Sequence, residues 1–285
     1  MVKRMDNEAL VSVIIRTCNR PEILKTALNS LRLQTYSNIE IIVVEDGENQ
    51  SEKMIKSQYS DLKIRYFCMG KKVGRTKTGN YALKQAKGEY FNFLDDDDAF
   101  YSNHIEELIK AINQSNNLAA YSIAEESQIQ VVSCNPYKFI EKRKFIRYAQ
   151  PFNRILLFHS NYIPIQSILF SRKLYDKLGG FDESLEVLED WDVWARYATM
   201  TEFTFVPIVT SVYYVPAVRN KKQKRVNELH VAENYIQKKF ENYQVTMNVG
   251  QIYSDMEYVI KKYKTGQMIR YLRMIWNFIL YGEKI

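Results

Sequence analysis

The 285-residue sequence has few cysteines and no long apolar run, and both shortages exclude classes of protein. Its three cysteines, Cys18, Cys68 and Cys134, are far apart and form no CxxC pair. This argues against a disulfide framework or a structural zinc site and favours a reducing compartment. No run of about 18 apolar residues occurs, so no membrane-spanning helix is expected. The apolar stretch near the N-terminus is short and interrupted by Arg16, unlike a secretory signal.

The composition is that of a folded chain with a surplus of positive charge. Apolar residues make up 46%, enough to bury one large core or a core with a small annex. The net charge of +7 and the pI near 9.0 favour a partner of opposite sign, such as nucleic acid, anionic lipid or a phosphorylated substrate. Basic residues gather in 137–154 and 218–225, although either run alone is typical of a solvated loop.

The first hundred residues alternate between β-branched runs and amphipathic helical stretches. Strands are predicted at 11–15, 39–47, 63–67 and 90–94. This order predicts an α/β fold with a doubly wound, mostly parallel, Rossmann-like sheet and helices on both faces. Ligands bind such sheets at the carboxyl ends of the strands. Because Glu45–Asp46 and Asp95–Asp98 follow two of these strands, the acids are expected to belong to a site, although Glu45 also suits a purely structural role.

Four consecutive aspartates, Asp95 to Asp98, follow the fourth predicted strand. Like charges about 4 Å apart repel by roughly 4 kcal/mol at an effective dielectric of 20, so something should offset this cost. In an extended segment Asp95 and Asp97 would share one face, and Asp96 and Asp98 the other. A magnesium ion takes one or two carboxylates and completes its shell with substrate phosphates. The alternative is a solvated acidic turn that caps the helix starting near Ser102.

Three blocks of sequence then indicate a family. They read "VSVIIRTCNRPEILKTALNSLRLQTYSNIEIIVVEDG", "GNYALKQAKGEYFNFLDDDD" and "GGFDESLEVLEDWDVW". Together they resemble the family 2 glycosyltransferases of GT-A fold, over about residues 10–200. The resemblance implies transfer of a sugar, with inversion, from a nucleotide-diphosphate donor to an acceptor hydroxyl, and an Mn²⁺ or Mg²⁺ ion that bridges the diphosphate. A UDP-sugar is the expected donor. The expected acceptor is a growing surface glycan or a lipid-linked saccharide.

The same resemblance assigns roles on the donor side. The turn from Thr17 to Arg20 resembles the wall of the base pocket, Asp46 the acid that binds the base, and Asp95 the acid that faces the ribose. The family's usual arginine before Asn80 is missing, because position 79 is glycine, and Arg75 is expected to replace it. The expected nucleotide-binding residues are therefore Thr17, Arg20, Asp46, Arg75, Asn80, Asp95 and Asp96, and the expected metal ligand is Asp97.

On the acceptor side, an inverting transfer needs a base within reach of the attacking hydroxyl. Asp190 matches the family's base best and Glu189 second, and a helix N-terminus would stabilise either carboxylate. Trp191 is expected to stack on a sugar, and Gly180 to let the backbone approach the acceptor closely. The alternative makes Trp191 and Trp194 core residues and the acids a helix cap.

A soft boundary near residues 217–225, where strand-like segments give way to helical ones, divides the chain into two parts. Residues 1–217 are expected to form the transferase domain, with a nucleotide-binding half at about 1–100 and an acceptor half at about 101–217. Residues 218–285 are expected to be a basic linker and a C-terminal helical extension. The linker could meet a diphosphate, and the segment 267–285 suits either an interfacial helix or a packed one. A cytoplasmic enzyme, peripheral at the inner face of the plasma membrane, is therefore expected, with its oligomeric state open.

Two other interpretations stay open, and a third is disfavoured. A sugar nucleotidyltransferase would carry a glycine-rich phosphate loop, which "RTCNRPE" (16–22) lacks. A catalytically inactive nucleotide-sugar-binding or scaffolding protein would not need the intact acids, yet the missing arginine at Gly79 keeps it possible. A nucleic-acid partner is not expected, because no recognisable nucleic-acid module is present.

Overall fold

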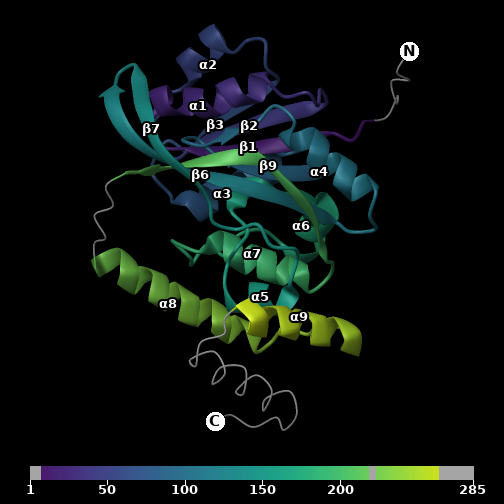
Figure 1. The fold of residues 1–285 in the computed structure, drawn as a ribbon. Coiled ribbons are helices and arrows are strands. Elements are labelled where there is room, and N and C mark those ends of the chain that lie inside the picture. Colours follow the sequence, from purple (N-terminus) through teal and green to yellow (C-terminus); the bar gives the residue numbers. More distant parts are fainter. Residues whose placement is uncertain (1–7, 218–222, 263–285) are drawn as a thin grey trace.

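The computed structural model describes residues 8–217 and 223–262 and shows an α/β protein built on one curled sheet (Figure 1). Its first half alternates strand and helix as predicted. The strands are β1 (Val11–Thr17), β2 (Ile39–Glu45), β3 (Ile64–Cys68) and β4 (Tyr90–Asp95), and the helices α1 (Pro21–Arg32), α2 (Glu52–Gln58) and α3 (Arg75–Gln85). The four strands are parallel and lie in the order β3-β2-β1-β4, which confirms the doubly wound arrangement.

The second half adds mixed strands to this parallel core. Its strands are β5 (Ala99–Phe100), β6 (Ala119–Cys134), β7 (Tyr137–Ile146), β8 (Ile168–Ser171) and β9 (Phe203–Pro216). Its helices are α4 (His104–Asn113), α5 (Arg154–His159), the short 3₁₀ helix η1 (Ile165–Ser167), α6 (Arg172–Leu178) and α7 (Glu189–Ala198). The sheet continues from β4 through β8, β6 and β9 to β5, and β8 runs antiparallel to both of its neighbours.

Strand side chains alternate between two cores, one on each face of the sheet. In β1, Val13 and Ile15 join the core under α1 and α4, whereas Ile14 joins the core that also contains Trp194 of α7. The apolar face of α1 explains why this helix forms where predicted, since the buried positions recur at helical spacing. These buried positions are Leu24, Ala27, Leu28 and Leu31.

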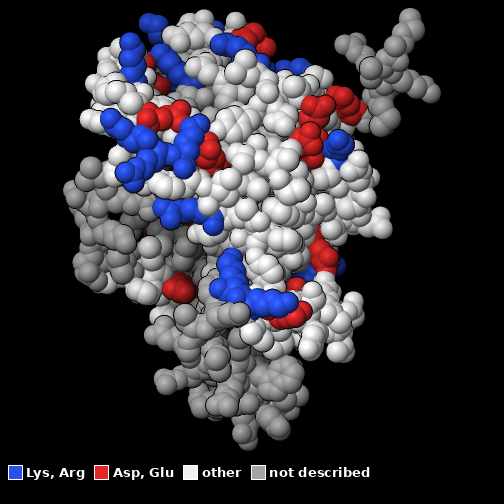
Figure 2. Space-filling view, in the orientation of Figure 1, with Lys and Arg blue, Asp and Glu red and all other residues white. Residues whose placement is uncertain are grey.

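A long hairpin of β6 and β7 includes much of the basic run 137–154, which by itself is typical of a solvated loop. The hairpin lacks an apolar alternation because β7 is largely exposed, from Lys138 to Ile146 apart from Phe139. The basic run 137–154 thus becomes an exposed strand and the segment that follows it. Figure 2 shows Lys and Arg side chains gathered on the side of the molecule where Figure 1 places β7.

The C-terminal helices α8 (Gln223–Phe240) and α9 (Val249–Lys262) pack against α5 and α7 (Figure 1). Ala232, Ile236 and Val259 are buried in the same core as Trp194. The described part of the predicted helical extension is therefore packed on the α/β fold. Residues 218–222 and the predicted helix at 267–285 lie outside the described residues. Within the described ranges, every helix is too short or too polar to cross a bilayer.

Candidate active site

The carboxyl ends of β1, β2 and β4 bring the donor-side residues to one edge of the sheet. The strand register places Arg16 opposite Asp95 and Thr17 opposite Glu45. Asp46 follows β2 directly, and its backbone N–H donates to the Thr17 carbonyl at 2.7 Å. The acids that follow β2 and β4 therefore lie at the same edge of the sheet, and the expectation that they form one site stays a prediction.

Asp96 is fully buried and holds the turn between Thr17 and Arg20. The Thr17 hydroxyl donates to Asp96 Oδ2 at 2.6 Å, and the Arg20 guanidinium donates to both carboxylate oxygens, with Nε at 3.1 Å. Burial raises the pKa of Asp96 to about 7, and the Arg20 charge opposes this rise. Asp96 therefore does not face solvent. It supports the Thr17–Arg20 turn, the predicted wall of the nucleotide-base pocket, from the protein interior.

Asp97 is the most exposed of the four aspartates, with 38% of its side chain accessible. The chain turns here, since the Asp98 N–H donates to the Asp95 carbonyl at 3.1 Å. Burial nevertheless alternates as expected for the four acids: Asp96 and Asp98 are buried, and Asp95 and Asp97 are half-buried. Asp98 Oδ1 accepts from the Tyr214 N–H at 3.0 Å, so its carboxyl anchors β9.

The residues present fit a divalent metal ion that would take most of its coordinating oxygens from a bound diphosphate. Among residues 8–217 and 223–262, no group of three His, Cys, Asp or Glu side chains could hold a metal unaided. Asp97 keeps one 3.4 Å contact with Arg20, and burial together with the charge of Asp95 raises its pKa. A divalent cation beside Asp97 would favour its anion. One or two carboxylates completed by a diphosphate are a normal magnesium environment.

Asp46 is buried and fixes the loop that leads into α3. Its carboxylate accepts from the backbone N–H of Val73 at 2.6 Å and of Gly74 at 3.1 Å. Glu45 is also committed, since it accepts from the N–H and the hydroxyl of Ser51. The structural role considered for Glu45 agrees with these contacts.

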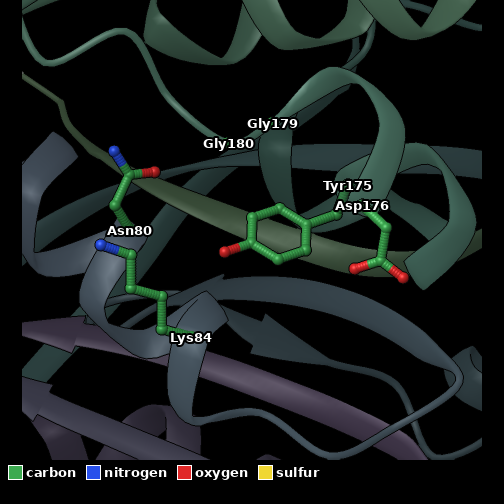
Figure 3. Close-up of a pocket in the computed structure, with 6 residues that line it drawn as sticks. All are labelled: Asn80, Lys84, Tyr175, Asp176, Gly179 and Gly180. Carbon is green, nitrogen blue, oxygen red and sulfur yellow. The ribbon is translucent and has the colours of Figure 1, made fainter.

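Asn80 on α3 clamps the glycine turn that precedes α7. Its Oδ1 accepts from the Phe181 N–H at 2.8 Å, and its Nδ2 donates to the Phe181 carbonyl at 3.0 Å. A Cβ at Gly180 would clash with Asn80 Oδ1, so this turn needs glycine. Asn80 and Gly180 also line a pocket of about 370 Å³ with Lys84 and Tyr175, whose hydroxyl points toward α3 (Figure 3). No aspartate of the Asp95–Asp98 run lines this pocket.

The two predicted base candidates begin helix α7, and their environments differ. Glu189 is buried and forms ion pairs with Arg16 at 3.0 Å and with Arg75 at 3.5 Å. Asp190 is half-buried; its Oδ2 accepts from Asn161 Nδ2 at 2.9 Å. Burial, reinforced by the charge of Glu189, raises the pKa of Asp190 to about 7. A carboxyl with a pKa near neutrality and partial access to solvent suits a general base better than one committed to two arginines.

Trp191 lies in the core, as in the alternative considered for it. It is 2% exposed, its Nε1 donates to the Leu157 carbonyl at 2.6 Å, and its ring packs edge-on against Phe240 at 5.7 Å. Because no ring face reaches solvent, the sugar-stacking role predicted for Trp191 does not fit this structure, and acceptor contacts must come from elsewhere.

Arg16 is the residue that sequence reasoning missed. Its NH2 donates to Asp95 Oδ1 at 2.9 Å and its NH1 to Glu189 Oε1 at 3.0 Å. It therefore joins the donor-side edge to α7, two elements predicted to belong to one site. The sequence signal for such a role is a charged residue within an otherwise apolar strand.

Comparisons with known sequences identify the family of this chain. The sequence profile of glycosyl transferase family 2 matches residues 12–179, more than half of the chain. An uncharacterized glycosyltransferase of Rickettsia typhi is 34% identical over 209 residues, which cover 72% of this chain and 63% of that protein. The chain thus spans less than two thirds of that relative. The uncharacterized glycosyltransferase YwdF of Bacillus subtilis is 30% identical over 206 residues, 71% of this chain and 73% of YwdF.

Solved structures share the fold at low sequence identity. S. aureus TarS 1-349 in complex with UDP has a TM-score of 0.66 and 17% identity, over 91% of this chain and 73% of TarS 1-349. The mannosyltransferase PcManGT from Pyrobaculum calidifontis, in complex with GDP-Man and Mn²⁺, has a TM-score of 0.58 and 16% identity, over 85% of this chain and 67% of PcManGT. The fold is thus GT-A, and with the family profile and the sequence relatives the chain is shown to belong to glycosyl transferase family 2.

Proposed function

We propose that this protein is a metal-dependent, inverting hexosyltransferase. It moves a sugar from a nucleotide-diphosphate donor, first of all a UDP-sugar, to an acceptor hydroxyl of a growing surface glycan or a lipid-linked saccharide. The observation that carries the proposal is the meeting of two acid groups at Arg16. Asp95, beside the half-exposed Asp97, lies 2.9 Å from Arg16 on one side, and Glu189, beside Asp190, lies 3.0 Å from it on the other.

The donor diphosphate would lie at the β4 edge. Asp97, with Asp95 beside it, would hold an Mn²⁺ or Mg²⁺ ion, which would neutralise charge on the departing diphosphate. Arg20, whose side chain is 41% exposed, would add positive charge at the same edge. The turn from Thr17 to Arg20, fixed by Asp96, would support the nucleotide base. Asp46 would hold the loop before α3, which would close against the same base.

The acceptor would approach from the α7 side. Asp190 would take the proton of the acceptor hydroxyl as its oxygen attacks the anomeric carbon. The bond from that carbon to the phosphate oxygen would break on the opposite face, and the nucleoside diphosphate would leave with the electron pair. A single displacement of this kind inverts the anomeric configuration. The hydrogen bond from Asn161 would keep the Asp190 carboxylate oriented toward the acceptor hydroxyl.

The nucleotide base and the cellular setting are finer parts of the proposal. TarS is described in complex with UDP and with UDP-GlcNAc, which favours uridine, and PcManGT in complex with GDP-Man keeps guanosine as the second choice. A lipid-linked acceptor would place the enzyme in the cytoplasm, peripheral at the inner face of the plasma membrane.

Calorimetric titration tests the donor site. UDP, GDP, dTDP and their sugar conjugates would be titrated with Mn²⁺, with Mg²⁺ and with EDTA. We expect one nucleotide to bind only with metal, and Asp97→Ala to lose that binding. Asp61→Ala is the matched control, because Asp61 is an exposed acid paired with Arg32 on another part of the surface. If no nucleotide binds with any metal, the transferase proposal fails.

A further inference from the structure

Arg16 is a buried cation that touches both sides of the proposed site. Its side chain is 5% exposed, and its guanidinium lies near the rings of Phe93 at 5.6 Å and Phe181 at 5.3 Å. Burial lowers the pKa of Arg16, but the charges of Asp95 and Glu189 outweigh burial and raise it above its ordinary value. The guanidinium therefore stays charged and gives one nitrogen to each carboxylate.

The space around Gly79 explains why the cation comes from β1. A Cβ at Gly79 would lie 2.6 Å from Phe181 Cε2 and 3.4 Å from Arg16 Cδ. The Phe181 ring and the stem of Arg16 already fill the place where a side chain from this position of α3 would begin. The resemblance puts the family's usual arginine at position 79. Here Arg16 reaches the same space from the neighbouring strand.

Arg75, the replacement expected from the sequence, is placed less favourably. Its side chain is 49% exposed, and its single ion pair, with Glu189, is 3.5 Å long. A half-exposed pair of this length is screened by solvent and contributes little. Arg16 is closer to Glu189, at 3.0 Å, and also pairs with Asp95 at 2.9 Å.

We propose that Arg16 is a positioning residue of the transfer site. It holds Glu189, and with it the start of α7 that carries Asp190, in fixed register with Asp95 at the donor edge. This rests on the proposed function for its catalytic consequence, although the coupling itself is structural. A guanidinium can bridge two carboxylates through separate nitrogens, whereas a lysine ammonium is a compact point charge on a flexible stem.

A double-mutant cycle tests the coupling without any assay of activity. Arg16→Gln, Glu189→Gln and the double variant would be unfolded in urea. Breaking a buried ion pair leaves an uncompensated charge, so we expect Arg16→Gln alone to unfold at the lowest urea concentration. Adding Glu189→Gln should restore part of the loss. The same cycle on Arg75 and Glu189 is the control and should show a much smaller coupling, because Arg75 is half-exposed and its ion pair with Glu189 is 3.5 Å long. Additive losses for Arg16 and Glu189 would overturn the proposal.

The pH dependence of donor cleavage tests the consequence for Asp190. The rate of nucleoside diphosphate release would be measured with the donor found by titration. The charged groups facing Asp190 are Glu189 on its own helix and Arg16 from β1, with Arg75 acting through Glu189, and Asn161 is its neutral partner. Arg16→Gln removes a positive charge, which should raise the pKa of Asp190 and move the acidic limb of the pH–rate profile to higher pH. Glu189→Gln removes a negative one and should move it lower.

The charge-preserving variant separates positioning from charge. Arg16→Lys should keep the acidic limb near its wild-type pH, yet lose about 100-fold in rate, because one ammonium cannot hold both carboxylates in place. Donor affinity should change far less than the rate. A wild-type rate in Arg16→Lys, or an unshifted limb in Arg16→Gln, would overturn the proposal.

The two proposals fail in different ways. If no nucleotide binds to the wild-type protein but the cycle still shows coupling between Arg16 and Glu189, the proposed function fails and the structural bridge stands. If the wild-type protein binds and cleaves a donor but the cycle is additive, the bridge fails and the proposed function stands.

Discussion

The acids after β4 and the acids that begin α7 both include neighbouring carboxylates, whose repulsion is offset in the same way, by an arginine that pairs with one of them. In the first group the buried Asp96 takes the Arg20 guanidinium, and its neighbour Asp97 stays half-exposed. In the second group the buried Glu189 takes Arg16, and its neighbour Asp190 stays half-buried. In each pair one acid is committed to an arginine and the other remains available. Adjacent acids can thus be kept close without being equivalent, which is how a site holds carboxylates for separate roles.

The two groups differ in what fixes them. Asp96 receives a hydroxyl from Thr17 as well as the guanidinium, all from the β1 side of a rigid parallel sheet. Glu189 depends on arginines from β1 and α3, and the residue before it, Leu188, has a left-handed backbone with φ of 60°. The β4 group is therefore expected to be rigid, and the α7 group to respond more strongly to loss of a partner.

The largest expected effect comes from removing the available acid of the α7 pair. Asp190→Asn should lower the transfer rate by about 10²- to 10⁴-fold, because the acceptor hydroxyl loses its base. Donor affinity should stay close to wild type, since Asp190 is proposed to contact the acceptor and not the donor. Measuring nucleoside diphosphate release beside calorimetry checks both expectations. A variant that still turns over normally would break the division between Glu189 and Asp190.

Loss of the hydroxyl that serves the committed acid of the β4 pair should appear in stability. Thr17→Val keeps the shape but leaves the buried Asp96 without one donor, at a cost of about 1–3 kcal/mol in the free energy of unfolding. Urea denaturation would measure this. Ser57→Ala, at an exposed hydroxyl on α2, is the control and should cost much less. Equal costs would mean that Asp96 does not depend on Thr17.

The pH dependence should report the available acid of the α7 pair. The pKa of Asp190 is raised to about 7, and the base must be ionised, so activity is present above that pH and is lost as pH falls through it. The rate at low donor concentration should drop about tenfold per pH unit on the acidic side. A rate that stays constant between about pH 5 and pH 8 would contradict the assignment of Asp190 as the general base.

A smaller shift should follow from the neutral partner of Asp190. The Asn161 amide favours the Asp190 carboxylate, so Asn161→Ala should move the acidic limb to higher pH by less than about one unit. The limb would be compared with that of Asn117→Ala, which removes an amide that bonds Thr204 near the start of β9. An identical limb in both variants would show that Asn161 does not tune the base.

Local sequence patterns predicted the parallel half of the fold but not the hairpin. The strands β1, β2 and β4 are apolar runs buried on both faces, so their composition shows in the sequence, and the half-buried β3 is also rich in β-sheet formers. The hairpin does not, because β7 is exposed almost throughout and reads "YKFIEKRKFI", with charges where a half-buried strand would alternate. β7 pairs with β6 as the next strand along the chain, but its exposure leaves it without the apolar alternation that would mark a strand in the sequence.

The site was predictable where its residues follow strands and less so where contacts decide. Asp46 and Asp95 could be placed at one edge because parallel strands end together. Arg16 could not be recognised as a bridge, since Glu189 is 173 positions away along the chain. Trp191 packs against Phe240 from the C-terminal helix α8, and the sequence around Trp191 gives no sign of this contact.

The most direct test of the account is the configuration of the sugar released from the donor when water takes the place of the acceptor hydroxyl and gives its proton to Asp190. Proton NMR at early times, before mutarotation, would follow the anomeric proton during cleavage by the wild-type protein and by Asp190→Asn. We predict an inverted sugar and free nucleoside diphosphate from the wild type, and loss of cleavage in the variant. A sugar of retained configuration, or undiminished cleavage by Asp190→Asn, would contradict a single displacement assisted by Asp190.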